Sequence, residues 1–95
     1  MTLSAPPKAA APLYRWLTDR LAVYMDRAPE SIDPTVPLAA YGMDSVCALS
    51  LCGDVEDELG IAVEPTLAWD HPTVAALAGH LAARGVRLPD GGRER

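Results

Sequence analysis

The sequence predicts a small all-α domain: a four-helix bundle with three longer helices, one short helix and a long first loop. Apolar residues recur at helical spacing in three separate runs, over residues 13–24, 46–59 and 74–81. A segment with three prolines and no such periodicity, residues 29–44, separates the first two runs. The chain has 95 residues, 49% of them apolar, which suits one domain with a single core.

The first helix is expected to begin near Pro12, because proline suits an early helical position. It should end by Ala28, because Pro29 disfavours helix in the residue before it. Its apolar face is predicted to comprise Leu13, Trp16, Leu17, Leu21 and Tyr24.

Composition divides the chain into three parts. Residues 1–11 are rich in Ala and Pro and are expected to form a flexible tail or linker, and residues 12–85 the folded domain. Residues 86–95 contain a proline and a Gly-Gly pair and are expected to form a second flexible tail.

The second helix is expected to run from Ser45 to Leu59, with Asp44 or Ser45 as its cap and Gly60 after its end. Its predicted apolar stripe is Val46, Leu49, Cys52, Val55 and Leu59, and Leu51 extends it on one flank. Acids crowd its C-terminal half, where they oppose the macrodipole and have no basic partner one turn away. This unpaired acidic face favours a role in binding outside the domain. The acids are Asp54, Glu56, Asp57 and Glu58.

The last third of the domain is expected to contain a short helical turn over residues 66–70 and a final helix. Pro72 fits the first position of that helix, and Gly85 closes it. His71 is expected to be a surface or capping residue before Pro72, and His80 is expected to be solvated. Cys47 and Cys52 lie five residues apart on one helix, which excludes a disulfide, and no cluster of ligands predicts a metal site.

The distribution of charge narrows the class of partner. The formal net charge is −5, and between residues 28 and 83 there are nine acids and no Lys or Arg. Nucleic acid is therefore disfavoured, while proteins with basic patches are favoured through steering of encounter. No apolar run is long enough to span a membrane, and the N-terminus lacks the apolar core of a signal peptide. A cytoplasmic location is the default expectation.

Two motifs at this spacing carry a family resemblance. Gly42-Met43-Asp44-Ser45-Val46 precedes the acidic helix, and Trp69-Asp70-His71-Pro72-Thr73-Val74 follows it. The pattern resembles an acyl carrier protein of the polyketide or fatty acid synthase type, and the resemblance spans about residues 13–83. In that family the serine carries a 4′-phosphopantetheine arm, whose thiol holds an acyl chain as a thioester. The resemblance implies that Ser45 is the attachment site.

The resemblance also implies partners and roles for neighbouring residues. A phosphopantetheinyl transferase would attach the arm with Mg²⁺ in its own site, and Asp44 either helps to position the hydroxyl or the metal or only caps the helix. An acyl-loading enzyme (acyltransferase or acyl-AMP ligase) and a ketosynthase would then exchange cargo with a monomeric, non-catalytic carrier. Val46, Glu56 and Asp57 are the expected recognition residues. Gly53 departs from the bulkier apolar residue of many carriers, which leaves partner choice open.

Three alternatives remain. A peptidyl carrier of nonribosomal peptide synthesis usually shows Gly-Gly-x-Ser, whereas Met43 and Asp44 precede Ser45 here. A helical adaptor that carries nothing would explain the acidic helix but not a serine at the exit of a long anchored loop. A hydrolase built on Ser45, His71 and Asp70 is disfavoured, because adjacent Asp and His seldom reach each other and no GxSxG elbow exists.

Overall fold

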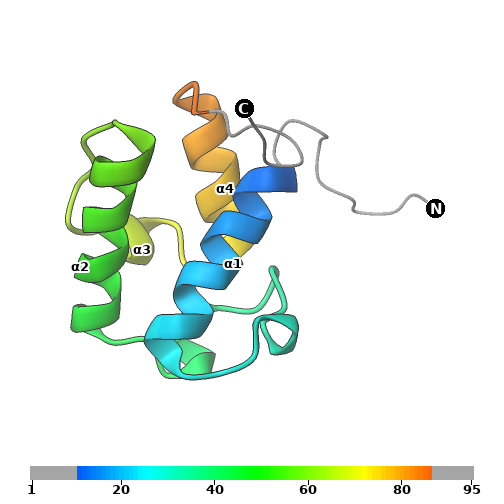
Figure 1. Cartoon of the computed structure of the whole chain (residues 1–95). Helices are drawn as coiled ribbons and strands as arrows, with labels where there is room; N and C mark the ends of the chain where they lie inside the picture. The colour runs from blue at the N-terminus through cyan, green and yellow to red at the C-terminus, as the bar shows by residue number, and fades with distance from the viewer. Residues whose placement is uncertain (1–10, 87–95) are drawn as a thin grey trace.

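A computed structural model describes residues 11–86 of the protein, and the regular elements in this part of the chain are all helical (Figure 1). The α1 helix packs against both α2 and α4, and the short α3 helix packs against α2. The predicted bundle of three longer helices and one short helix is thus confirmed. Of the expected tails, residues 1–11 and 86–95, residues 1–10 and 87–95 lie outside the described residues, and Ala11 belongs to α1. The α-helices are α1 (Ala11–Met25), α2 (Ser45–Asp54), α3 (Leu67–Asp70) and α4 (Val74–Ala83).

Three further helical turns complete the fold, two wound more tightly than an α-helix and one wound more widely. Two 3₁₀ turns, η2 (Pro29–Ser31) and η3 (Leu38–Tyr41), lie in the long first loop. A π-helical turn, η4 (Val55–Leu59), continues α2, so the predicted second helix is confirmed over its full length but changes winding after Asp54. None of the described helices is long and apolar enough to cross a membrane.

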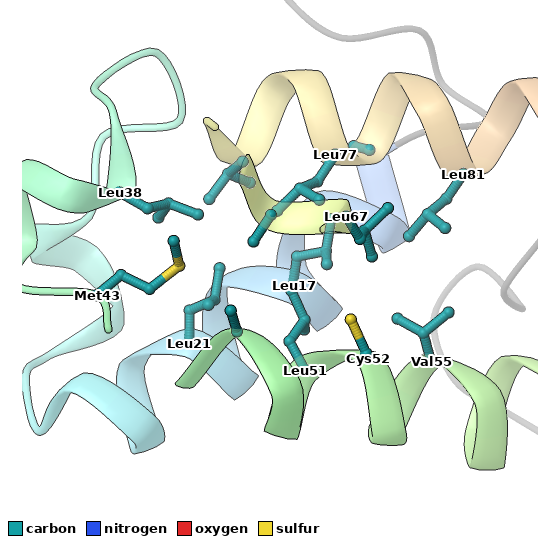
Figure 2. Packing of buried hydrophobic residues seen from close by; sticks show 14 of the residues in the cluster. Leu17, Leu21, Leu38, Met43, Leu51, Cys52, Val55, Leu67, Leu77 and Leu81 are labelled. Atoms are coloured by element: carbon teal, nitrogen blue, oxygen red, sulfur yellow. The ribbon is translucent and has the colours of Figure 1, made fainter. Parts of the chain in front are cut away.

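One leucine-rich core holds the elements together. Figure 2 shows Leu17 and Leu21 of α1, Leu51 of α2 and Leu77 of α4 pointing toward one another, and all four are fully buried. The predicted face of α1 is confirmed: its three leucines are buried, and Trp16 and Tyr24 pack against the core while partly exposed. Apolar burial of this kind is the main favourable term in folding.

The α1 helix ends at Met25, three residues before Ala28, because Asp26 adopts a left-handed conformation with φ 54°. The N–H of Asp26 donates to Val23 O at 3.3 Å, and the N–H of Arg27 donates to Ala22 O at 3.0 Å. These two bonds are those of a Schellman motif, which satisfies carbonyls that the helix leaves free.

The predicted apolar stripe of α2 is partly wrong. Val46 and Leu49 are 72% and 55% exposed, and the side chains that enter the core in their place are Cys47 and Ala48. Leu51, expected on the flank of the stripe, is fully buried. The small Cys47 and Ala48 side chains face the core because α2 packs on both α1 and α3. Cys52 and Val55 are buried as predicted, and Leu59 packs partly buried against the core.

The start of α4 differs from the prediction, whereas its end agrees with it. The helix begins at Val74, not Pro72, because the Thr73 side chain caps it by accepting from the N–H of Ala76 at 3.0 Å. Gly85 adopts a left-handed conformation, and the N–H of Val86 donates to Leu81 O at 3.0 Å. Val86 is buried by this cap, so it belongs to the fold and not to the tail in which it was expected.

Some of the acids of α2 and η4, which were predicted to be unpaired, have partners in α1. Arg20 of α1 forms an ion pair with Glu58 and lies 3.9 Å from Asp54, while its guanidinium covers the Trp16 ring at 5.2 Å. The hydroxyl of Tyr24 donates to Asp54, and this hydrogen bond with partial burial raises the pKa of Tyr24 to about 12. Two of the four acids therefore join α2 and η4 to α1.

His71 was expected to be a surface or capping residue and His80 to be solvated; both are partly exposed, and they contact each other. Their rings stack with centroids 4.1 Å apart and planes 20° apart, which ties the end of α3 to α4. Burial, with the nearby His71 and Arg84, lowers the pKa of His80 below its ordinary value, although Asp70 acts in the opposite direction. The pair lines a cavity of about 330 Å³ with Leu67 and Arg84.

Candidate functional site

The long loop between α1 and α2 is held from both sides. Ile32, Leu38 and Met43 are buried, and Figure 2 shows Leu38 and Met43 pointing from the loop into the leucine core. Two backbone hydrogen bonds tie the loop to the start of α4: Leu38 N to Pro72 O at 2.8 Å, and Ala75 N to Pro34 O at 2.9 Å. The loop is thus an integral part of the packed domain, although it has no long helix or strand of its own.

The loop exit turns sharply at Gly42. Its φ is 92°, a conformation that side chains with a Cβ rarely adopt, and its N–H donates to Ala39 O at 3.1 Å. Met43 follows at once, with its N–H on Leu38 O at 3.3 Å and its side chain buried. A left-handed turn followed by a buried anchor sets the direction in which the chain enters α2.

Asp44 caps α2, and Ser45 is the first residue of the helix. The carboxylate of Asp44 accepts from the N–H of Cys47 at 2.9 Å, and this hydrogen bond lowers the pKa of Asp44 below its ordinary value. The sequence left two caps open, and the structure selects Asp44. The Ser45 side chain consequently remains exposed at the positive end of the α2 dipole.

Two exposed apolar side chains lie next to Ser45. Val46 follows it in the chain, and Leu49 lies one turn further along the same side of α2, because residues three and four apart are neighbours on a helix. We call these three residues the Ser45 face. Leu49 was expected in the core. The feature of the sequence that points to its exposure is the pair of small residues Cys47 and Ala48, which lie on the other side of the helix.

The expected acidic recognition residues lie further along. Glu56 and Asp57 are both exposed on η4, and Glu56 also accepts from the N–H of Val63 at 3.3 Å. Gly53 is exposed as expected, with open space where a Cβ would lie, so a larger side chain would fit there. This part of α2 is therefore flat at Gly53 and acidic beyond it.

The structure does not assemble a hydrolase site. His71 stacks on His80, and Asp70 accepts from the Thr66 hydroxyl at 2.9 Å instead of orienting His71. The cavity lined by His71 does not include Ser45. Among residues 11–86 there is no group of three or more metal-ligating side chains.

Cys47 and Cys52 are both free and buried; burial was expected for Cys52, whereas Cys47 was not part of the predicted apolar stripe. The Sγ atoms lie 3.5 Å from Tyr24 O and from Glu64 O, respectively. Burial, with the nearby Glu56, raises the pKa of the Cys52 thiol. These thiols act as small core side chains.

Comparison with known proteins places this geometry in a family. A family model described as "Phosphopantetheine attachment site" matches residues 15–81. The chain is 41% identical over 73 residues to one component of the phenolphthiocerol/phthiocerol polyketide synthase of Mycobacterium tuberculosis; the match covers 77% of this chain and 4% of that relative. The chain thus spans a small fraction of the length of that relative.

Solved structures of carrier proteins share the fold. A free-standing peptidyl carrier protein from Acinetobacter baumannii superposes with a TM-score of 0.78 and 41% identity, covering 82% of this chain and 98% of that protein. Asl1650, an acyl carrier protein from Anabaena sp. PCC 7120, superposes with a TM-score of 0.71 and 31% identity. The match covers 88% of this chain and 96% of that protein.

The protein is a non-catalytic carrier domain, and it belongs to the phosphopantetheine attachment family. Members of this family hold 4′-phosphopantetheine covalently on a serine. The residues present fit such a group: Ser45 offers an exposed hydroxyl at the N-terminus of a ten-residue helix, where the dipole and free N–H groups favour a phosphate.

We predict that Asp44→Ala lowers the melting temperature by a few degrees, whereas Asp44→Asn, which still caps, has a smaller effect. Because folding lowers the pKa of Asp44, its charge-dependent stabilisation is complete above the ordinary carboxyl pKa of 3.8 and is lost as the pH falls through the lowered value. Thermal unfolding at neutral and strongly acidic pH measures both effects. An Asp44→Ala variant as stable as the wild type at neutral pH would contradict the assigned cap.

Proposed function

We propose that Ser45 is the attachment site for 4′-phosphopantetheine, and that the domain carries acyl intermediates of polyketide biosynthesis. The observation that carries the assignment is the exposed Ser45 hydroxyl at the start of α2, between the Asp44 cap and the apolar Val46. The bound group supplies a terminal thiol that holds the cargo as a thioester. The chain's own residues present the attachment point and the surface around it. The proposed carrier domain is residues 12–85 together with Ala11 of α1 and the buried Val86.

The choice of a polyketide pathway rests on relatives. Two of them, the mycobacterial synthase component described above and 6-methylsalicylic acid synthase of Aspergillus terreus, are 41% and 36% identical to the chain over the matched residues. The alternative is a peptidyl carrier, which is favoured by the 41% identity to the Acinetobacter peptidyl carrier protein. A non-carrying adaptor is not supported, because the family is defined by an attachment serine.

The proposed partners are a phosphopantetheinyl transferase, an acyl-loading enzyme (acyltransferase or acyl-AMP ligase) and a ketosynthase. The proposed state is a cytoplasmic monomer. Asp44 holds the first turn of α2 in place for the transferase, and its hydrogen bond to the N–H of Cys47 supports this role. Val46 would contact partners directly, since it is 72% exposed beside the attachment point.

Glu56 and Asp57 would steer partners by charge. Both are exposed on η4, and weak charge-steered contacts suit a carrier that must leave each partner quickly. Asp54 and Glu58 are less suited to this role, because α1 already engages them through Tyr24 and Arg20.

The central prediction concerns attachment. Incubation with coenzyme A, Mg²⁺ and a broad-specificity phosphopantetheinyl transferase should add one phosphopantetheine to the wild-type chain and none to Ser45→Ala, as measured by intact-protein mass. Ser50→Ala is the matched control, because it removes a second α2 serine and should leave the mass gain intact. Folded wild-type protein that gains no mass would overturn the proposal.

A second prediction tests steering. The Glu56→Lys/Asp57→Lys variant should slow turnover by basic partner enzymes about tenfold at low salt, and added salt should narrow the difference. Its stability should change little, because cations are favoured near the C-terminal end of a helix. The measurement is the rate of partner-catalysed loading as a function of ionic strength.

Asp19→Lys/Glu30→Lys is the control for that experiment, since it makes the same change in net charge with exposed acids of α1 and η2. If this control slows turnover equally, net charge and not the η4 acids governs encounter. Unaltered turnover in the Glu56/Asp57 variant would remove both residues from the recognition surface.

A further inference from the structure

Tyr41 occupies a particular place in the loop, four residues before Ser45 and at the end of η3. Its ring packs partly buried against the core, and its hydroxyl accepts from the N–H of Asp33 at 2.8 Å. The bond spans the loop and joins two segments eight residues apart. A phenylalanine would fill the same apolar space as the Tyr41 ring. The specific contribution of the Tyr41 hydroxyl is therefore the hydrogen bond across the loop.

Asp33 is itself fixed. Its carboxylate accepts from the N–H of Thr35 at 2.8 Å and from the Thr35 hydroxyl at 2.7 Å, which forms a tight side-chain turn. These two bonds lower the pKa of Asp33 below its ordinary value. The N–H that reaches Tyr41 therefore comes from an ordered segment.

The Tyr41 ring also connects to the end of α1. The Arg27 guanidinium lies 4.4 Å from the ring centroid, within the range of a cation–π contact, and its Nε donates to the Ser31 hydroxyl at 2.9 Å. We call Arg27, Tyr41 and Asp33 the Tyr41 brace. It joins the residues just after α1 to the loop segment that leads to Ser45.

We propose that Tyr41 is a positioning residue for Ser45, which the Tyr41 brace holds ready for the phosphopantetheinyl transferase. The inference rests on the proposed attachment at Ser45. Between Tyr41 and Ser45 lie a left-handed glycine, the buried Met43 and the Asp44 cap, so an ordered Tyr41 leaves this short segment little freedom. A loop ordered before binding spares the enzyme the entropy of ordering it.

The test is a comparison of Tyr41→Phe with Tyr24→Phe. Both substitutions remove one hydroxyl and its hydrogen bond, but Tyr24 bonds to Asp54 between α1 and α2 and lies outside the Tyr41 brace. With a broad-specificity transferase and coenzyme A, Tyr41→Phe should raise the KM for the carrier about threefold and leave kcat nearly unchanged. Tyr24→Phe should lower the melting temperature without raising KM.

A second readout does not depend on the transferase. Amide hydrogen exchange at Asp33 and over residues 42–45 should accelerate in Tyr41→Phe and stay at the wild-type rate in Tyr24→Phe. Unchanged exchange over residues 42–45 would overturn the positioning role. So would a KM that rises equally in both variants, since lost stability alone would then account for it.

The outcomes separate this inference from the proposed function. Wild-type protein that is modified at Ser45, with Tyr41→Phe modified at the same KM, would remove the role of Tyr41 and leave the attachment site standing. Wild-type protein that is not modified at all would overturn the attachment site and the role of Tyr41 together.

Discussion

The burial of two loop side chains in the helical core is the constraint on which the rest of the structure depends. Leu38 is fully buried and Met43 is 8% exposed, and both point into the cluster formed by the helices (Figure 2). A long loop without such anchors could move without exposing buried apolar surface to water. With them, displacement of the loop would open the core. The position of Ser45 is therefore as stable as the packing of the leucines.

Periodicity was sufficient to predict the helices, and it was insufficient to predict the buried side of α2. Val46 and Leu49 are larger and more apolar than the buried pair Cys47 and Ala48, so hydropathy alone favours the wrong phase of the helix. The phase is set by how closely α1 and α3 approach, which small side chains permit, and this is a tertiary effect. For the same reason, the exposure of the apolar side chains beside Ser45 could not be predicted. This exposure matters, because an apolar residue indicates a contact surface only when it is exposed.

Contacts between distant residues explain why the side-chain partners of several surface residues differ from the prediction. The capping residues Asp44 and Thr73 act within three positions of themselves, and such local chemistry can be found from sequence. Arg20 meets Glu58 across 38 residues, Tyr41 meets Asp33 across a loop, and His71 stacks on His80. None of these pairs has a local signal. Charge patterns along one helix therefore overstate how many acids are free.

This reduction in free acids changes what the surface can do. Of the four acids that the sequence assigned to an outward-facing cluster, two bind α1 and Glu56 also accepts a backbone N–H. The negative charge of this surface is still sufficient to steer the encounter with a partner protein, because steering depends on the summed electric field and not on individual contacts. Discrimination between partners needs short-range contacts, and in the proposed function these would come from the apolar Val46 beside the attachment point, with the exposed Leu49 one turn further along the same side. Under that proposal, the acids of η4 would attract partners and the Ser45 face would discriminate between them.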